Sequence, residues 1–395
     1  MLIKSLEYSE YNGDPRSWKV SGLEFGNINL VVGKNASGKS RVMRAIHGLG
    51  RIISGKIPPK FATGTWKVIF SRQKGKITEE QIYILELQNG TVQKEAFQID
   101  GKLIMSRDET GNGFVIRKSN QERVRYKVPV DQLMTVVRRD EIQHPFFEHI
   151  HRWGSSACFY EFGSDFGKSN LTMPTPTTEN ATLNMSDLAD NAANVFHATF
   201  ERFGEQYKKI LLSDLDELGY ACDDVLTTPI NVAGGIAGGL TPHALAIKET
   251  NLNVPTLQHE MSQGMYRALA ILIQFNANIL WTQSLMVGRQ PNPGDSPMII
   301  IDDIGEGLDY SRSKNLISVL VRKSEENHVQ LILTSNDRFI MNDVPLPYWT
   351  VLHRTAGTIK AFNFENSKNA FEEFSFMGLS NFDFFSGQYF LPEEK

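Results

Sequence analysis

The sequence predicts an α/β fold with a mixed β-sheet, an antiparallel β lobe and a short helical insert. An apolar run over residues 28–32 leads into a glycine-rich turn and then into an amphipathic stretch. Two later apolar runs, 298–301 and 329–333, each end in polar residues, and short alternating runs fill residues 65–128. Apolar runs of this kind are typical of buried parallel strands, whereas alternation between turns is typical of an antiparallel meander.

The first segment, residues 1–53, holds the first strands and a complete G-x-x-x-x-G-K-S motif. This phosphate loop consists of Gly33, Lys34, Asn35, Ala36, Ser37, Gly38, Lys39 and Ser40. Its glycines let the backbone approach phosphate groups, and the N–H groups at the start of the next helix face the anion. We expect Lys39 to reach the outer phosphates, Ser40 to ligate Mg²⁺ and Arg41 to complete the nucleotide site. The alternative is a chance Gly-Lys-Ser turn before a helix.

The middle of the chain has two predicted parts. Residues 54–130 form the antiparallel β lobe, with strands over 66–71, 81–87, 91–99, 102–105, 113–116 and 123–128. Residues 131–255 form a region of loop and helix. Within it, 164–184 is rich in Ser, Thr, Pro and Asn and reads as a mobile loop, and apolar positions three to four residues apart predict a helix over 185–218. The glycine-rich segment 234–239 is predicted to be a flexible linker.

Residues 256–350 hold the remaining motifs. Ser262 is a plausible N-cap for the apolar stretch over 268–281, and Gly264 leaves room for close approach of a phosphate. The strand over 298–301 ends in Asp302 and Asp303, and parallel strands of α/β folds present their ligand-binding residues at this edge. Asn336 follows the next strand. By themselves, Ser-x-Gly before a helix is an ordinary cap, and Ser-Asn-Asp after a strand is an ordinary turn.

In this order the motifs resemble those of the ABC-type ATPases, in the branch of structural-maintenance-of-chromosomes (SMC) and RecF-like proteins. Residues 261–265 stand at the five signature positions, and Ser262 and Gly264 match; Gln263 lies between them. Residues 307–309 stand at the D-loop. The resemblance covers roughly residues 1–53 and 257–349, whereas the middle is similar only in layout. Between Ser40 and Ser262 no sustained heptads occur, so the chain is expected to be a P-loop ATPase head without a long coiled coil.

The resemblance implies ATP and Mg²⁺ as cofactors. Asp302 is expected to hold the Mg²⁺ shell through water, and Asp303 stands where the family usually has a water-polarising Glu. Asn336 replaces the usual switch His, so it can hydrogen-bond to the γ-phosphate but cannot take up a proton. Gln143 is the candidate for the glutamine loop, which in the family touches Mg²⁺ and the γ-phosphate; otherwise it is an exposed loop residue.

The family also implies self-association. ATP would lie between the phosphate loop of one copy and residues 262–264 of another, in a dimer or a higher oligomer. Two biological readings stay open: a regulatory ATPase of a bacterial anti-phage system that controls a separately encoded effector, or a RecF-like DNA-repair ATPase. A small-molecule P-loop kinase shares only the phosphate loop, and a transporter subunit is disfavoured by the long insert after it.

Composition narrows the remaining options. The net charge is −4, and the two cysteines fit a reducing cytosol. We expect a cytoplasmic protein without a membrane span, because the apolar stretches fall short of about 20 residues. Basic residues cluster, with nine Lys or Arg and no Asp or Glu over residues 41–76. That cluster, and a second over 117–139, fits either a lobe that binds DNA or a solvated face.

Two further patterns concern single residue types. His144, His149 and His151 lack the spacing and the carboxylate or cysteine partners of a metal site, so we reject one there. The final segment, 351–395, is rich in aromatic residues. Phe371, Phe374 and Phe376 are predicted to cover the sheet edge as core; the alternative is an exposed partner site.

Overall fold

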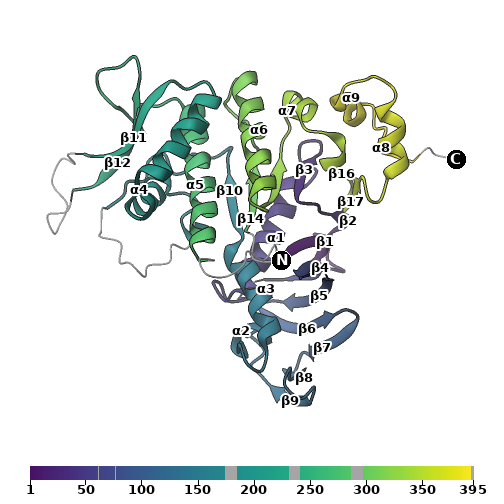
Figure 1. The fold of residues 1–395 in the computed structure, drawn as a ribbon. Coiled ribbons are helices and arrows are strands. Elements are labelled where there is room, and N and C mark those ends of the chain that lie inside the picture. Colours follow the sequence, from purple (N-terminus) through teal and green to yellow (C-terminus); the bar gives the residue numbers. More distant parts are fainter. Residues whose placement is uncertain (61, 76, 174–184, 231–240, 286–296, 393–395) are drawn as a thin grey trace. The chain divides into compact units, whose positions relative to one another are not determined.

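A computed structural model of the chain describes residues 1–60, 62–75, 77–173, 185–230, 241–285 and 297–392 (Figure 1). The chain divides into two compact units. Unit 1 comprises Met1–Ala157, Pro291–Met298 and Val344–Lys395, and unit 2 comprises Cys158–Gln290 and Ile299–Asp343. The predicted linker over 234–239, and the part of the predicted mobile loop over 174–184, lie outside the described residues.

A mixed sheet forms the centre of unit 1. Strand β3 (Ile28–Val32) is buried along its whole length and pairs in parallel with β16 (Trp349–Thr355). The hairpin partner of β16, β17 (Thr358–Asn363), is antiparallel to it and parallel to β2 (Trp18–Glu24), which in turn is antiparallel to β1 (Leu2–Glu10). The predicted mixed sheet is therefore confirmed, and its β16–β17 hairpin is an addition that the sequence analysis missed.

The predicted meander is also confirmed. From β1 the sheet continues through β4 (Gly64–Lys74), β5 (Ile77–Gln88), β6 (Thr91–Ile99), β7 (Lys102–Arg107), β8 (Asn112–Ile116) and β9 (Arg123–Lys127), each antiparallel to the one before (Figure 1). Along β5, the alternate positions from Gln81 to Leu87 are buried. Alternation of this kind fixes which face of a strand packs on the core.

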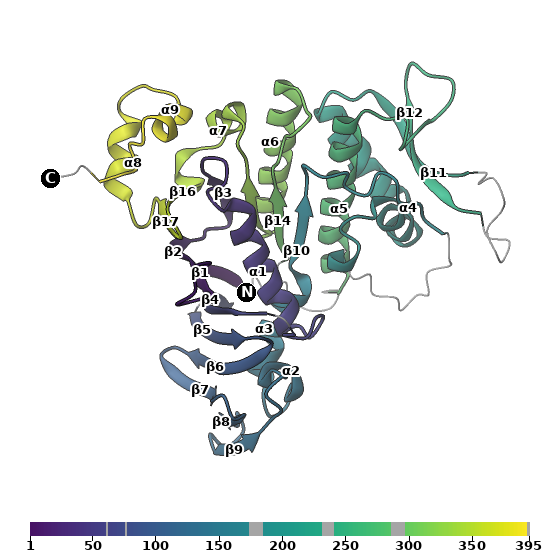
Figure 2. The ribbon, with the colours of Figure 1, turned by 180° about the vertical axis from the view of Figure 1, so that it is seen from behind.

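Three helices accompany this sheet: α1 (Lys39–Ile53), α2 (Met134–Val137) and α3 (Pro145–Ser156). Helices α1 and α3 meet at the end of α1 that is remote from the phosphate loop, as Figure 2 shows. There a Cβ added to Gly154 would lie 2.4 Å from the carbonyl oxygen of Gly50. Trp153 of α3 packs edge-on against Phe70 of β4, with ring centroids 4.7 Å apart. These contacts hold α3 between α1 and the sheet.

Helices α8 (Lys368–Ser375) and α9 (Asn381–Ser386) close unit 1 with an aromatic core. Phe371 and Phe374 are buried against Phe384, with centroid distances of 4.5 and 5.0 Å. Phe390 packs on Phe362 of β17. The core prediction is thus confirmed for Phe371 and Phe374. It is wrong for Phe376, which is 88% exposed because it lies just beyond the end of α8.

Unit 2 has its own strands and helices. Strand β10 (Cys158–Glu161) is parallel to β14 (Met298–Asp302), whose other neighbour is β15 (Gln330–Thr334). Helix α4 (Ala192–Glu217) lies alongside α5 (Gln263–Leu285), and α6 (Tyr310–Glu326) precedes β15 and α7 (Arg338–Asp343) (Figure 1). A small separate sheet is formed by β11 (Cys222–Pro229), β12 (His243–Glu249) and β13 (Thr256–Leu257).

The predicted helix over 185–218 is present with two modifications. It starts as a short 3₁₀ turn, Met185–Asp187, and α4 proper follows the N-cap Asn191. Gly204 breaks the helical geometry with φ of 55° and ψ of −138°, which glycine adopts without a Cβ clash. At 26 residues α4 is still too short for the arm of a long coiled coil. Among the described helices, none combines the length and apolar character needed to cross a bilayer.

The contact between α1 and α3 gives a first test. Gly154→Ala should lower the free energy of unfolding by about 1–3 kcal/mol, because the added methyl group meets backbone rather than a flexible side chain. Gly48→Ala is the matched control: its Cβ would meet nothing within 4 Å, so the better helix former should stabilise α1 by up to about 1 kcal/mol. Urea denaturation of both variants measures the difference, and equal stabilities would contradict the packing described.

Candidate functional site

The phosphate loop between β3 and α1 leaves no room for side chains at its two glycines. A Cβ on Gly33 would lie 2.4 Å from Ser37 Oγ. Gly38 has a φ of +100°, and a Cβ there would lie 2.6 Å from Ile359 Cδ1. Between them Ala36 adopts a φ of 60°, which is uncommon for a residue with a side chain. The close approach of the backbone that a phosphate requires is therefore built into this turn.

Two cations hold the loop in shape. Lys39 is only 6% exposed, and its Nζ donates a hydrogen bond of 3.0 Å to the carbonyl oxygen of Gly33. Arg354, at the end of β16, donates from Nη1 to the carbonyl of Ala36 at 2.9 Å and from Nε to the carbonyl of Ala356 at 2.7 Å. The tip of the loop is thus tied to the β16–β17 turn, and the ammonium group of Lys39 is kept inside the loop.

The residues present fit an anionic group. Gly38 is the N-cap of helix α1, and no side-chain hydrogen bond from the described residues caps this end. The first turn of α1 contains no acidic residue. The hydroxyl of Ser37 is buried and has no hydrogen-bond partner in the part of the chain that the structure describes. A buried polar group without a partner is costly, and the start of a helix favours negative charge. A phosphate at this turn would give the Ser37 hydroxyl a hydrogen-bond partner and would place negative charge at the start of α1.

The side chain of Arg41 is already engaged on the outside of α1. Its guanidinium lies 4.5 Å from the centre of the Trp18 ring and forms an ion pair with Glu10 of β1. The side chain of Arg41 therefore fixes the start of α1 against the sheet. The predicted contact of Arg41 with a nucleotide would be made by its backbone N–H.

In unit 2 the two predicted acids lie where β14 meets β15. Asp302 is 5% exposed and accepts a hydrogen bond of 2.5 Å from Thr334 Oγ1, which itself accepts one of 2.9 Å from the backbone N–H of Asp303. Asn336 stands two residues beyond Thr334 and is exposed. The structure thus brings Asp302, Asp303 and Asn336 to one edge of this sheet, as the strand pattern predicts.

The signature segment begins α5 in the way the sequence indicates. Ser262 Oγ accepts a hydrogen bond of 3.2 Å from the backbone N–H of Met265, which confirms it as the N-cap. Gln263 Nε2 donates to the carbonyl of Ser164 at 3.4 Å. For Gly264 the structure gives a reason that the sequence did not: a Cβ there would lie 2.3 Å from the carbonyl oxygen of Gly307, so the signature and the D-loop pack backbone to backbone.

Arg267 is a buried residue beside the signature segment whose contacts the sequence analysis did not predict. It is 7% exposed, and its guanidinium donates to three carbonyls: Gly163 at 2.7 Å, Ser164 at 2.9 Å and Glu306 at 2.9 Å. The signature helix, the segment after β10 and the D-loop thereby form one hydrogen-bonded assembly. A lone Arg opening a long apolar helix is the signal that could have revealed it, since a buried cation requires partners.

Gln143 lies outside unit 2, to which these acids belong. It belongs to unit 1, where its N–H donates to Asp140 Oδ1 at 2.9 Å and its carbonyl accepts from the N–H of Lys118 at 3.1 Å. The segment that lies beside the acids within unit 2 is β10, where Glu161 stands opposite Asp302 in the strand register. The glutamine-loop role of Gln143 therefore stays a prediction, and Glu161 is a second candidate for that position.

The three histidines of the sequence analysis lie in unit 1. Burial, and after it the charge of Arg139, lowers the pKa of His151 to about 4. The described residues contain no group of three or more His, Cys, Asp or Glu side chains suited to a metal ion.

Comparison with known proteins gives structural likenesses only. No family model matches the chain, and no curated protein matches it in sequence. Among solved structures, an SMC head bound to the C-terminal winged-helix domain of ScpA is 15% identical, covers 91% of this chain and 97% of its own, and has a TM-score of 0.47. The SMC head of Thermotoga maritima is 13% identical, with coverages of 92% and 99% and a TM-score of 0.42. An SMC head from Pyrococcus furiosus is 14% identical, with coverages of 95% and 99% and a TM-score of 0.44.

The role of Arg267 can be tested by hydrogen exchange. Arg267→Lys keeps the charge but cannot donate to three carbonyls at once, so backbone amides over 303–309 should exchange about tenfold faster, equivalent to ~1.4 kcal/mol. Arg322→Lys, at an exposed position on α6 where the side chain pairs with Glu217, is the control and should leave these rates unchanged. Unaltered exchange over 303–309 in Arg267→Lys would show that the assembly does not depend on the guanidinium.

Proposed function

We propose that the chain is a Mg²⁺-dependent ATPase of the ABC type that hydrolyses ATP slowly and acts as a conformational switch. The observation that carries the proposal is the phosphate loop. Its glycines cannot bear a Cβ, its lysine is held inside the turn, and the buried hydroxyl of Ser37 lacks a partner within the described chain. A chance Gly-Lys-Ser turn requires none of these features, whereas close approach of the backbone and a nearby cation are what a phosphate-binding loop needs.

Each residue then has a defined part. Lys39 and the N–H groups at the start of α1 bind the β- and γ-phosphates, and the Ser40 hydroxyl ligates Mg²⁺, as in phosphate loops generally. Asp302, held by Thr334, orients water in the metal's shell. Asp303 polarises the attacking water, and Asn336 hydrogen-bonds to the γ-phosphate. The bound Mg²⁺ supplies neutralisation of the charge that develops on the phosphates.

Slow turnover follows from Asp303. Its side chain is shorter than Glu by one C–C bond, about 1.5 Å. A displacement of about 1 Å can cost on the order of a hundredfold in rate. The left-handed backbone at Asp303, with a φ of 54°, also sets the direction of the side chain away from that of the preceding strand. Because a poorly placed carboxylate slows hydrolysis, ATP stays bound for longer and the ATP-bound state can act as a signal.

The nucleotide also controls assembly in this proposal. A single copy offers the γ-phosphate few donors, and Ser262 and Gly264 of a second copy complete the set in a head-to-tail dimer or higher oligomer. ATP therefore favours the closed state through its differential affinity, and hydrolysis removes that preference. The packing of Gly264 on Gly307 supports this, because the signature and the D-loop would present one joint surface to the second copy.

For the biological role we favour a regulatory ATPase of a bacterial anti-phage system that controls a separately encoded effector. The supporting observation is that the aromatic C-terminal segment carries four exposed large apolar side chains, Phe376, Met377, Leu379 and Tyr389. Large apolar side chains gathered on a surface mark sites of protein association. Co-purification of a nuclease or toxin encoded beside this chain is the result that this role requires.

A RecF-like ATPase that clamps duplex DNA is the alternative. One observation favours it: the edge strand β9 exposes Arg123, Arg125 and Lys127 at alternate positions. Cations in such a row neutralise phosphates, so affinity would fall steeply with salt. Stimulation of ATP hydrolysis by duplex DNA, lost at high salt, would select this alternative over the effector role.

Lys39 gives the direct test of nucleotide binding. Lys39→Ala should weaken Mg²⁺-ATP binding on the order of 10- to 100-fold, because charge-assisted hydrogen bonds to phosphate are lost. Lys60→Ala, at an exposed lysine of the same unit, should bind as the unmodified chain does. Isothermal titration calorimetry measures the affinity of both variants for Mg²⁺-ATP. Equal affinities would show that the loop does not take part in nucleotide binding.

Substitution of Asp303 tests whether the chain acts as an ATP-dependent switch. In Asp303→Asn the water is no longer polarised, so an ATP-bound dimer should accumulate and be visible by light scattering. Phosphate release by the unmodified chain should stay below ~10 s⁻¹, the median for enzymes. Asp216→Asn, which alters an exposed carboxylate on α4, is the control for the loss of charge. Absence of ATP-dependent association in Asp303→Asn, or fast phosphate release by the unmodified chain, contradicts the switch.

A further inference from the structure

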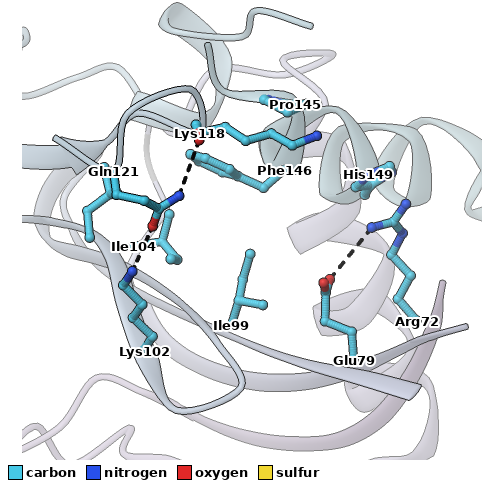
Figure 3. A pocket seen from close by; sticks show the side chains of 11 residues that line it. Arg72, Glu79, Ile99, Lys102, Ile104, Lys118, Gln121, Pro145, Phe146 and His149 are labelled. Atoms are coloured by element: carbon cyan, nitrogen blue, oxygen red, sulfur yellow. Dashed lines mark hydrogen bonds and ion pairs between the residues drawn. The ribbon is translucent and has the colours of Figure 1, made fainter. Parts of the chain in front are cut away.

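A second concave site lies on the antiparallel lobe of unit 1 and includes no residue of the phosphate loop. It opens where strands β4 to β8 meet the first turn of α3, and its volume is about 270 Å³ (Figure 3). Four apolar side chains form its floor: Ile99, Ile104, Ile116 and Phe146. Small-ligand sites commonly combine such a floor with a few placed polar groups, and this volume lies just below their usual range of about 300–1,000 Å³.

The polar groups around this floor are mainly cations. Arg72 from β4, Lys102 from β7 and Lys118 from the turn after β8 all line the pocket, and Glu79 is the one acidic side chain among its lining residues. Glu79 is paired with Arg72 at 3.6 Å. Lys102 donates instead to the neutral amide of Gln121 at 2.7 Å. Figure 3 shows these groups around the apolar floor. The rim therefore carries net positive charge.

Two further features favour an anion at this rim. Helix α3 begins at Pro145, so its first turn, with the positive end of the helix, faces the pocket through Pro145 and Phe146. His149 lies one turn further along α3. Its pKa is lowered to about 3, mainly by burial and then by the charges of Arg72 and Arg152. The imidazole is therefore neutral at pH 7, and the positive charge of the site resides in the Arg and Lys side chains.

We propose that this pocket binds a small phosphate monoester whose apolar body lies on Ile99, Ile104, Ile116 and Phe146 while its phosphate lies at the cationic rim. A dianion suits the site better than a single carboxylate, because three cations and one acidic side chain line this rim. The pocket is distinct from the phosphate loop, with which it shares no residue. Its ligand is a different molecule from the nucleotide of the proposed ATPase.

The test uses a matched pair of fluorescent probes that differ only in the phosphate. 4-Methylumbelliferyl phosphate and 4-methylumbelliferone are each dialysed to equilibrium against the full chain in excess Mg²⁺-ADP, and also against Lys39→Ala. One equivalent of the phosphate ester should bind in both, and on the order of tenfold more weakly when the phosphate is absent. Equal binding of the two probes, or loss of binding in Lys39→Ala, overturns the proposal.

Variants of the exposed rim lysines locate the bound probe. Lys102→Ala and Lys118→Ala should each weaken binding of the phosphate ester about threefold to tenfold. Lys94→Ala is the control, since Lys94 is an exposed lysine of the same lobe that pairs with Glu86 outside the pocket. All three side chains are exposed, so the fold is not at risk. Binding that is unchanged in both rim variants, or weakened equally in Lys94→Ala, also overturns the proposal.

Discussion

The structure of the candidate site depends on one steric constraint, the absence of any room for a Cβ at Gly33 and Gly38. The loop adopts a shape in which the backbone at these two positions lies within contact distance of Ser37, Ile359 and Trp18, and the ammonium of Lys39 lies on the carbonyl of Gly33. That shape leaves the start of α1 without a side-chain cap in the described chain. An anion fits at such a helix start, and the proposed binding of the ATP phosphates depends on that fit.

Unit 2 is organised by a second constraint, the satisfaction of buried polar groups. The carboxylate of Asp302 is fixed by Thr334, and the guanidinium of Arg267 is satisfied by carbonyls of the D-loop and of the segment after β10. Hydrogen bonds to charged groups are stronger than neutral ones, and their loss is costly in a buried setting. The signature, the acids and the D-loop are therefore expected to move as one body when a nucleotide binds.

Much of this could be predicted from the sequence, because the relevant signals are local. The phosphate loop, the strands that end in Asp302 and Thr334 and the meander from Gly64 to Lys127 each follow from residue spacing within a few positions. What could not be predicted depends on contacts between distant segments. The strands β16 and β17 pair with β3 and β2 from the other end of the chain. The contacts of Arg267 appear only when Gly163 and Glu306 come near it, and the carbonyl of Gly307 explains why residue 264 has no side chain.

The central claim, that the loop between β3 and α1 binds the phosphates of ATP, is tested most directly by backbone hydrogen exchange over residues 33–41. Adding Mg²⁺-ATP should slow exchange of these amides, because the N–H groups of Gly38, Lys39 and Ser40 would donate to phosphate oxygens, whereas adenosine without phosphates should leave them unchanged. Exchange over 33–41 that is the same with and without saturating Mg²⁺-ATP would contradict the account.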